Sequence, residues 1–564
     1  MFINRLFLLF FKFLPQTNSL IDSDTDVGLL VAYIYQVWRR KSSAMDAVTH
    51  KLIFSPQLRV PTAREIWEDG SLTAAAILGL LTIVVLRYVR SPWRKVPPSP
   101  WRLPIIGNTL HLMDKSWLLS SNCKQRFGEV MYLDAAGQPT IVFNSLKSAF
   151  DLLERRASNY SDRPRLVMAQ EILSNGLVFA LMNYGERWRR LRRAAHEALS
   201  KKALRNYHPI QTKEATILVS SLLMPSASLY PDKQFQRFAA STIMSILYDH
   251  PTMVSEHDET LKMIEEYTLR LSHSAAPGSN LVDIFPWMMH IPERFAKWKR
   301  EGGRQFHEDY AMFRGLINRV RVDMANGGNR PSFSASLIQN PERNKLSEPE
   351  MSFLVGLMHA AGAETTATTL NWWTFAMIAY PEKQRKAQAE LDAVVGRDRL
   401  PTFADAPCLP YLSAVIKETL RWRPVVRFGA PHAATEDDWY EGLFIPKGAI
   451  CIPNTWNCSH DRAVFGEDAD EFRPERHLDE HGKLLSGPLE TNQAGHVTFG
   501  FGRRICVGKD LALDSLFISD GTDTVGDNPG ACLITRPAPY DCVVRRRFTG
   551  MESILEEERE RLEI

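Results

Sequence analysis

The feature that most constrains the fold is a glycine-rich segment around one cysteine, Phe499–Gly508, which reads Phe-Gly-Phe-Gly-Arg-Arg-Ile-Cys-Val-Gly. A thiolate that binds a metal needs hydrogen-bond donors directed at its sulfur, and glycine lets the backbone approach where a side chain would block it. Cys506 is therefore a candidate metal ligand, and Arg504 can offer a fork of donors to an anionic group nearby. Two alternatives stay open at this point. One is a buried structural cysteine in a tight turn, and the other is a phosphate-binding loop, although the third glycine of the dinucleotide spacing and a Gly-Lys-Ser/Thr sequence are absent.

Composition narrows the class of protein. Of 564 residues, 45% are hydrophobic and 24% are charged, which is ordinary globular usage and excludes a collagen, a wholly disordered chain or a polytopic membrane protein. The formal net charge, 68 − 65 = +3, is too balanced for a protein built around nucleic-acid phosphates, so no nucleic-acid partner is expected. Seven cysteines without a Cys-x-x-Cys pair favour a reducing compartment over a disulfide scaffold or a zinc module.

The amino-terminal part predicts a membrane attachment. The stretch Ser71–Leu86 carries no charge, acidic residues precede it and arginines follow it. This pattern predicts a single transmembrane anchor at 71–90 with the downstream chain in the cytosol, and a buried core helix is the alternative. The proline-rich segment 91–102 would form a stiff hinge after the anchor. Residues 1–70 are an extension of unknown role.

The remaining chain reads as one large, mainly helical domain. Amphipathic stretches such as Ser145–Arg156 and Glu186–Ser200 predict helices, whereas strand-like pieces are few and short, for example Val130–Leu133 and Thr140–Phe143. The predicted class is therefore mainly α, of the α+β type. The acidic run that ends the chain, within 550–564, predicts a solvated helix.

The longest predicted helix begins after Ser347, which can cap it while Glu350 completes a capping box, and can run to Tyr380. At about 1.5 Å per residue it would be roughly 50 Å long, enough to cross a domain. In its middle Glu364 and Thr365 follow the small residues Ala-Gly-Ala, which open a gap in the helix surface. An acid and a hydroxyl beside such a gap suggest a functional site, and a solvated polar face is the alternative.

The next helix contains Glu418 and Arg421, a carboxylate and a guanidinium on one face at i,i+3. Such pairs are mostly surface ion pairs of little energetic value, so the signal is weak by itself. Arg476 offers a second guanidinium that could close on Glu418, and an ordinary polar loop is the alternative for its segment.

Taken together, these residues resemble the cytochrome P450 superfamily, the haem-thiolate monooxygenases, and in particular its fungal microsomal members. The cysteine loop matches the family pattern Phe-x-x-Gly-x-Arg-x-Cys-x-Gly at every fixed position. The long helix matches Ala/Gly-Gly-x-Asp/Glu-Thr-Thr, the next helix matches Glu-x-x-Arg, and Arg476 falls on the arginine that joins that pair. Trp188–Arg192 is similar to the family's Trp-x-x-x-Arg, and in the proline segment Ser99 replaces the usual glycine. The resemblance covers residues 72–548.

The resemblance implies a helix-rich cytochrome P450 domain with small β-sheets over 103–549, preceded by a membrane anchor in the endoplasmic reticulum. It also implies a role for each matching residue. Haem b would take Cys506 as its axial thiolate ligand, which favours O–O cleavage. The other implied residues are Arg504, Trp188, Arg192 and His432 at the haem propionates, Phe499 and Gly500 in the haem-binding loop, Thr365 and Glu364 in proton delivery, and Glu418, Arg421 and Arg476 as a structural lock.

The implied reaction is insertion of one oxygen atom from O2 into an organic substrate. No flavin or nicotinamide module follows the domain, so electrons would come from NADPH through a separate cytochrome P450 reductase. The stretches that the family places near the substrate are mostly apolar, which predicts a lipophilic secondary metabolite or xenobiotic. Two alternatives are a haem-thiolate isomerase or dehydratase, which the intact Glu364 and Thr365 argue against, and a haem-binding protein without turnover.

The sequence departs from the family pattern after the cysteine loop. The expected helix begins at Asp510–Ile518 and ends early, and Leu533–Cys542 resembles the final segment of the family. Part of the expected helix and strand is therefore absent, through either a true deletion or an error in the predicted coding sequence. The predicted consequence is weaker haem retention or altered specificity, and this departure is what supports the alternative without turnover.

Overall fold

The computed structural model describes residues 71–104, 106–109, 121–224, 230–253, 259–276, 278–328, 331–518, 534–540 and 542–564. The chain divides into two compact units, Met1–Ser91 and Pro92–Ile564. In the first unit, helix α4 spans Ser71–Arg90. The predicted extension 1–70 lies outside the described residues.

Helix α4 forms where the sequence predicts a membrane anchor, but the predicted single-pass location is wrong. Within the described part of the chain, no helix is both long enough and apolar enough to span a membrane. The physical reason is length, because the uncharged stretch Ser71–Leu86 rises only about 24 Å at 1.5 Å per residue, against a hydrocarbon core of about 30 Å. Arg87 and Arg90 occupy the last turn of the helix.

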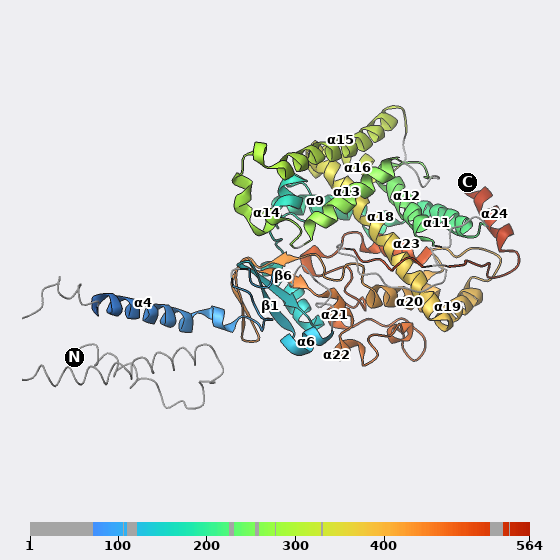
Figure 1. Cartoon of the computed structure of the whole chain (residues 1–564). Helices are drawn as coiled ribbons and strands as arrows, with labels where there is room; N and C mark the ends of the chain where they lie inside the picture. Colours follow the sequence, from blue (N-terminus) through green and yellow to red (C-terminus); the bar gives the residue numbers. More distant parts are fainter. Residues whose placement is uncertain are drawn as a thin grey trace, which may run out of the picture. The chain divides into compact units, whose positions relative to one another are not determined.

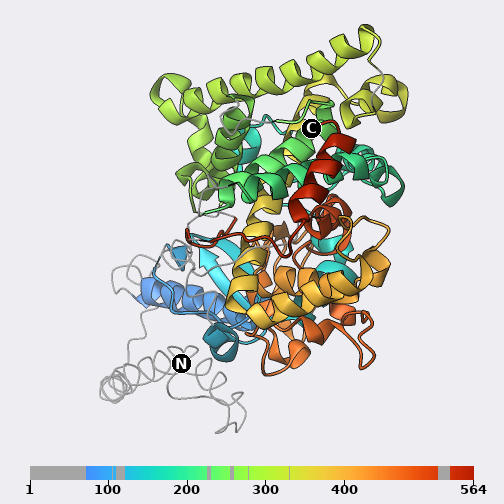
Figure 2. The ribbon, with the colours of Figure 1, turned by 90° about the vertical axis from the view of Figure 1, so that its right-hand side faces the viewer.

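The second unit confirms the helix-rich class with small sheets. Figures 1 and 2 both show α15 along one side of the unit, α18 passing through its middle, and the sheet with α20 on the other side. The helices are α6 Ser121–Phe127, α7 Leu146–Ala149, α8 Ala157–Tyr160, α9 Glu186–Ala198, α10 Lys201–Leu204, α11 His208–Leu222, α12 Asp232–Tyr248, α13 Glu259–Ala275, α14 Leu281–Ile284, α15 Lys297–Ala325, α16 Phe333–Gln339, α17 Pro341–Asn344, α18 Glu348–Ala379, α19 Pro381–Val394, α20 Pro410–Trp422, α21 Thr455–Ser459, α22 Arg462–Phe465, α23 Lys509–Ile518 and α24 Met551–Arg561.

The larger sheet joins segments that are far apart in the sequence. Strands β1 (Val130–Ala135) and β2 (Gln138–Phe143) form at the two predicted strand-like pieces, and each is longer by two residues. They pair as an antiparallel hairpin. Strand β6 (Ile450–Pro453) pairs in parallel with β2, and β3 (His432–Ala433) pairs antiparallel with β6. A separate hairpin comprises β4, Asp438–Tyr440, and β5, Leu443–Ile445.

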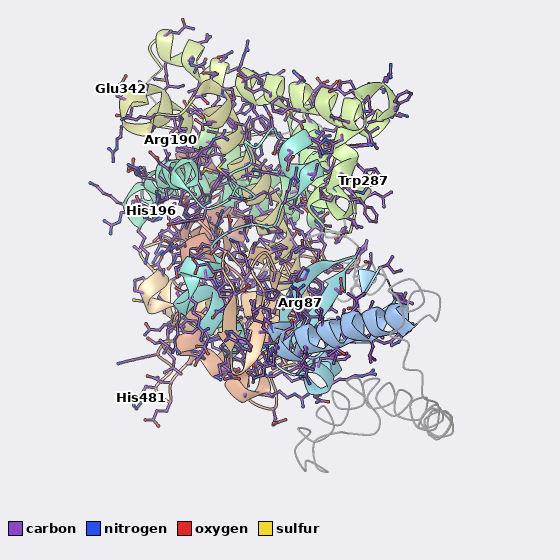
Figure 3. The ribbon with its side chains drawn as sticks, turned by 90° about the vertical axis from the view of Figure 1, so that its left-hand side faces the viewer. Arg87, Arg190, His196, Trp287, Glu342 and His481 are labelled. Atoms are coloured by element: carbon purple, nitrogen blue, oxygen red, sulfur yellow. The ribbon has the colours of Figure 1, made fainter. Side chains whose placement is uncertain are left out.

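Helix α18 confirms the predicted long helix and its start. Ser347 accepts a hydrogen bond from the Glu350 backbone N–H, and the Ser347 N–H donates to Glu350 Oε2 at 2.9 Å, which completes the capping box. The helix is apolar on nearly all sides, as expected of a helix that is buried in a core. Helices α12 and α15 pack along it, and Arg190 of α9, labelled in Figure 3, reaches Glu350 at 2.9 Å.

One predicted helix is divided. The amphipathic stretch Ser145–Arg156 forms α7, capped by Ser145, and then a π-helix over Phe150–Arg155. The carbonyl group of Leu153 at this π-turn lies against the cysteine loop, close to Gly502. The sequence pattern predicts a helix here but does not distinguish the α-helical form from the π-helical form.

Helix α23 follows the cysteine loop, and residues 519–533 lie outside the described residues. The chain is described again from Ile534, and its next residues bind to α18. The Trp372 indole N–H donates to the Thr535 carbonyl at 2.8 Å, and the Tyr540 hydroxyl donates to the Asn371 carbonyl at 3.0 Å. The segment that resembles the family's final segment is thus anchored to the central helix.

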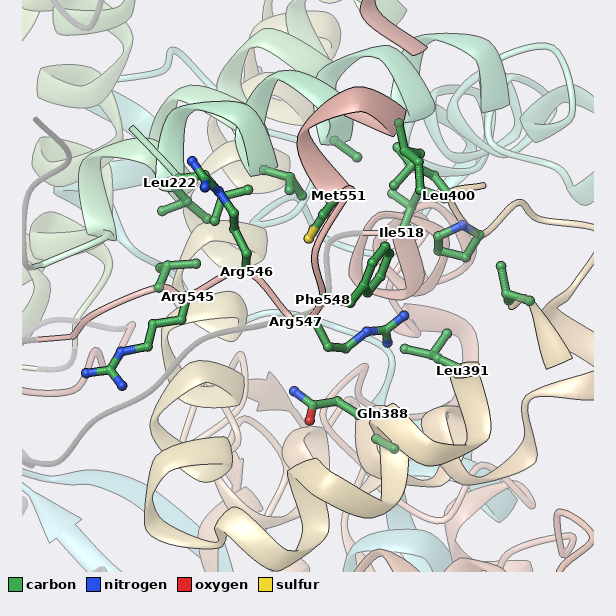
Figure 4. A pocket seen from close by; sticks show the side chains of 18 of the residues that line it. Leu222, Gln388, Leu391, Leu400, Ile518, Arg545, Arg546, Arg547, Phe548 and Met551 are labelled. Carbon is green, nitrogen blue, oxygen red and sulfur yellow. The ribbon is translucent and has the colours of Figure 1, made fainter. Parts of the chain in front are cut away.

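Helix α24 at the end of the chain is mostly exposed, but Leu555 is buried. Beside it lies a cavity of about 790 Å³ between α11, α19 and the segment that precedes α24 (Figure 4). Figure 4 shows Met551 and Phe548 among the side chains that line it. This cavity is separate from the site described next, since the two share no lining residue.

Candidate active site

A cavity of about 390 Å³ lies between α18, α9 and the cysteine loop. Its wall combines residues from five distant parts of the chain. Most of the predicted site residues line it, namely Trp188, Arg192, Thr365, His432, Phe499, Gly500, Arg504 and Cys506.

At one position of the cysteine loop, Gly502, only glycine fits the backbone conformation and the close packing. Gly502 has φ +57, and a Cβ placed there would lie 2.4 Å from the Leu153 carbonyl oxygen. Gly500 has φ +75 but open space around it. The Cys506 N–H donates to the Phe499 carbonyl at 2.8 Å and closes the loop. Close packing on the π-turn therefore fixes the position of the cysteine.

Cys506 presents its sulfur to the cavity. Part of the surface of Cys506 is accessible, and the residue lines the cavity. Its accessible surface therefore faces the cavity rather than the outside of the molecule. Burial raises the pKa of the thiol, while the Gly508 N–H and the positive charge of Arg192 act in the opposite direction. Helix α23 begins three residues later, and the positive end of a helix also favours a thiolate. Donors directed at the sulfur are what a metal-binding thiolate needs.

Three guanidinium groups line the same cavity. Arg504 donates to the carbonyl groups of Ser161 and Met182, both at 2.7 Å, and lies over the Trp188 ring at 4.5 Å. Arg163 donates to the carbonyl groups of Ala180, Ala430 and Pro431. Burial lowers the pKa of Arg504 to about 10 and that of Arg163 to about 9, so both stay positively charged at neutral pH. The third is Arg192, and its pKa is also lowered by burial.

The sequence did not predict Arg163. Its only signal is that it lies in the stretch that the family topology places near the substrate. Arg163 reaches the cavity because the segment before α9 runs beside β3, which is a tertiary contact and not a local pattern.

His432 stands on β3 and is buried. Its Nδ1 lies 2.7 Å from the Tyr160 carbonyl, so Nδ1 carries the proton and donates it. Burial lowers the pKa of His432 well below its ordinary value, and the positive charges of Arg163 and Arg504 add to this. In the neutral ring Nε2 is then an acceptor. An anionic group placed among these cations would favour the protonated ring, in which Nε2 is a donor as well.

These residues fit the haem that the sequence predicts. Arg504 Nη1 is buried and has no hydrogen-bond partner in the described part of the chain. Buried donors are rarely left unpaired, and cations gathered on one cavity call for an anionic group. The propionate carboxylates of haem would supply that group, while Cys506 supplies the ligand for its iron.

Glu364 and Thr365 are neighbours in α18 but face different cavities. Thr365 lines the cavity of Cys506, and its hydroxyl donates to the Ala361 carbonyl at 2.8 Å. Glu364 lines a separate cavity and pairs with Arg536, whose Nη2 lies 2.7 Å from Glu364 Oε1. Arg536 also binds Asp232 of α12 at 3.1 Å. The sequence did not predict Arg536, which lies in the segment after residue 533.

Glu418, Arg421 and Arg476 are brought together, but none of them lines the cavity. Glu418 and Arg421 are fully buried and joined by two hydrogen bonds of 2.7 and 2.8 Å, and Arg476 Nε donates to Glu418 Oε1 at 2.9 Å. His477 adds a donor that the sequence did not predict, with Nε2 2.9 Å from Glu418 Oε2. Burial raises the pKa of Glu418, but hydrogen bonds from Arg421 and His477 outweigh this and lower it to about 2.

Comparison with known proteins agrees with the family resemblance that the sequence indicates. Residues 97–519 match the family description of Cytochrome P450. A cytochrome P450 monooxygenase of Armillaria gallica is 48% identical over 87% of this chain and 97% of its own length. Cytochrome P450 monooxygenase 253 of Postia placenta is 43% identical over 85% of this chain and 94% of its own. Cytochrome P450 monooxygenase iboC of Amanita muscaria is 35% identical over 87% and 97%.

Proposed function

The chain belongs to the cytochrome P450 family and is a monooxygenase, and from this premise we propose its reaction in more detail. The protein inserts one oxygen atom from O2 into a lipophilic secondary metabolite or xenobiotic. Electrons come from NADPH through a separate cytochrome P450 reductase. The observation that carries the proposal is the meeting of Cys506, three guanidinium groups and Thr365 on one cavity.

Haem b supplies the oxidation chemistry when it is bound, and the chain supplies its position and surroundings. Cys506 would supply the thiolate ligand of its iron. Arg163, Arg192 and Arg504 would hold the propionate carboxylates by charge-assisted hydrogen bonds. The Trp188 ring supports Arg504 from one side. His432 on β3 would add a donor once the anionic propionates favour its protonated form.

Residues in the middle of α18 deliver the protons. The Thr365 hydroxyl faces the haem cavity and orders water there, while the Glu364 carboxylate exchanges protons with solvent in the separate cavity that it lines. Glu418, Arg421, Arg476 and His477 keep α20 fixed to the segment before the cysteine loop. Their role is structural, since they lie away from the cavity.

The cavity wall supports a lipophilic substrate. Apolar side chains from α12, α18, the segment before α9 and the segment after α20 line much of this wall, and such walls select apolar ligands. The few polar groups there are hydroxyl groups rather than charges. The apolar lining residues are Phe179, Ile243, Leu357, Met358, Val425 and Val426.

The docking of a reductase is supported by charge. Arg503 is exposed in the cysteine loop, and Arg189 and Arg193 are exposed on the neighbouring α9. A basic face of this kind complements an acidic partner surface. Such complementary charge raises the association rate more than it raises the affinity. Reduction rates should therefore fall as salt concentration rises, and a rate independent of salt would contradict this part of the proposal.

The deciding experiment is the carbon monoxide difference spectrum of the reduced holoprotein, with Cys506→Ala and Cys408→Ala as a matched pair. Cys408 is exposed and lies outside the cavity. The parent and Cys408→Ala should show the Soret band of thiolate ligation, and Cys506→Ala should lose it. A thiolate band that survives Cys506→Ala would refute the proposed ligand. NADPH consumption coupled to product, with reductase added, then separates turnover from haem binding alone.

A further inference from the structure

The segment before α24 carries an exposed hydroxyl directly after a run of arginines. It reads Arg-Arg-Arg-Phe-Thr from Arg545 to Thr549. The backbone over 542–550 forms neither helix nor strand, and Thr549 is exposed in it. The Thr549 hydroxyl has no hydrogen-bond partner among the described residues. The segment therefore presents a nucleophilic hydroxyl on an irregular, accessible stretch of backbone.

The three arginines of this segment are held weakly. Arg545 is exposed and has no ion pair in the described part of the chain. Arg546 is 51% exposed and pairs with Glu552 of α24, and Arg547 Nη2 lies 3.1 Å from Asp392 Oδ1. Figure 4 shows the three side chains leaving the segment in different directions. Because exposed ion pairs contribute little energy, a partner with a stronger negative charge can take over these guanidinium groups.

Arginines three and two residues before a Ser or Thr form the charge pattern that basophilic protein kinases select. Among the described residues the pattern occurs at one other place, before Ser158 of α8. There Arg156 donates to both carboxylate oxygens of Asp438 at 2.8 and 2.9 Å. The adjacent Asn159 side chain accepts two backbone N–H groups from the segment after β3. The fold thus holds Ser158 in a bonded helical turn and leaves Thr549 accessible.

The start of α24 offers a place for a phosphate. Gly550 is the N-cap residue of this helix and supplies no side-chain hydrogen bond to it. The first N–H groups of a helix need acceptors, and the helix dipole favours an anion at this end. A phosphate on Thr549 would be attached one residue before the N-cap, within reach of these N–H groups and of Arg545.

We propose that Thr549 is a phosphorylation site for a basophilic serine/threonine kinase and that the phosphate caps α24. The Thr549 hydroxyl oxygen bonds to the γ-phosphorus of ATP, and the bond from that phosphorus to the β-phosphate oxygen breaks. ADP leaves, and the hydroxyl proton passes to the catalytic carboxylate of the kinase. The new group carries about −1.5 to −2 charges at pH 7 and strong acceptor oxygens, which bind the N–H groups of α24 and the guanidinium of Arg545.

The first test is transfer of phosphate from ATP to the full chain by the catalytic subunit of cyclic-AMP-dependent protein kinase, with the sites mapped by peptide mass spectrometry. Phosphate should appear on Thr549 much faster than on Ser158, and Thr549→Ala should lose it. Arg546→Ala should lower kcat/KM for Thr549 by about tenfold or more, because it removes a cation that the kinase groove binds. Arg561→Ala, an exposed arginine of α24, is the matched control and should leave the rate unchanged. Absence of phosphate on Thr549, equal rates at Thr549 and Ser158, or equal rates in the parent and Arg546→Ala would overturn the proposal.

The second test is backbone hydrogen exchange of α24 with and without phosphate on Thr549. Phosphorylation should slow exchange in the first turn severalfold, because the phosphate accepts from N–H groups there. In Arg545→Ala the phosphate should slow exchange less, since one of its cationic partners is gone. Equal exchange in the phosphorylated and unmodified chains would overturn the proposed cap. Neither test depends on haem or on turnover.

Discussion

Glu418 is a buried carboxylate whose charge is stabilised by donors from three sides. Its pKa in the folded protein is about 2, against an ordinary value of 4.5. A group with a depressed folded pKa adds stability that is present above its unfolded pKa and is lost as the pH falls toward the folded value. The contribution at neutral pH is of the order of 3 kcal/mol, by conversion of the shift.

The free energy of unfolding should therefore fall between about pH 4.5 and pH 2 with a component that belongs to Glu418. Urea unfolding at several pH values checks this. Glu418→Gln should be less stable at pH 7 and should show a weaker fall over the same interval. An unchanged pH profile in Glu418→Gln would mean that the carboxylate contributes no such stability.

His477 permits a finer test of the same cluster. His477→Phe removes a donor to a charged carboxylate and should cost about 1.5–3 kcal/mol. His477→Gln keeps a donor of similar reach and should cost less. Melting temperatures of the two variants check this, and equal loss in both would indicate that the packing of the ring, not its N–H, stabilises the cluster.

At the scale of an element, the cysteine loop depends on its contact with the π-turn. Gly502→Ala would place a methyl group 2.4 Å from the Leu153 carbonyl, whereas Gly500→Ala meets open space and only strains a positive φ. We expect Gly502→Ala to lose most bound haem and Gly500→Ala to keep it, at a cost of about 1 kcal/mol in stability. Haem content per protein is the measurement. Similar haem loss in both would mean that backbone strain alone controls the loop.

The start of α18 gives a second prediction at this scale. Ser347→Ala removes the capping hydroxyl and should cost about 1 kcal/mol, with a range of about 0.5–2. Ser336→Ala is the control, because Ser336 is exposed on α16 and should change stability by less than about 0.5 kcal/mol. Chemical unfolding of both variants checks the difference, and equal effects would show that the capping hydroxyl adds no stability to α18.

At the scale of the whole molecule, the haem site joins α9, α18, β3 and the cysteine loop. A ligand that binds only the folded state stabilises it by mass action. The holoprotein should therefore melt several degrees above protein from which haem has been removed. Arg504→Gln should reduce this difference, because it removes one of the positive charges that we propose to hold the propionates. A melting temperature independent of haem would contradict the proposed location of the group.

The sequence alone established the parts that depend on neighbouring residues. The capping box at Ser347, the short strands β1 and β2, and the turn around Cys506 follow from residue types at fixed short spacing, because helix caps, strand propensity and glycine turns are local effects. Family resemblance added the expected roles of these residues. The membrane anchor was the exception, since charge order and apolar character predicted it while the length of the uncharged stretch did not suffice.

The tertiary structure decided which distant groups meet. Arg163 approaches Arg504, Arg536 approaches Glu364, and His477 approaches Glu418 across separations that no sequence pattern records. It also decided that Glu364 and Thr365 line two different cavities. Neighbours in a helix point about 100° apart, as 3.6 residues per turn require, but which cavity each side chain enters depends on how α12 and α13 pack against α18.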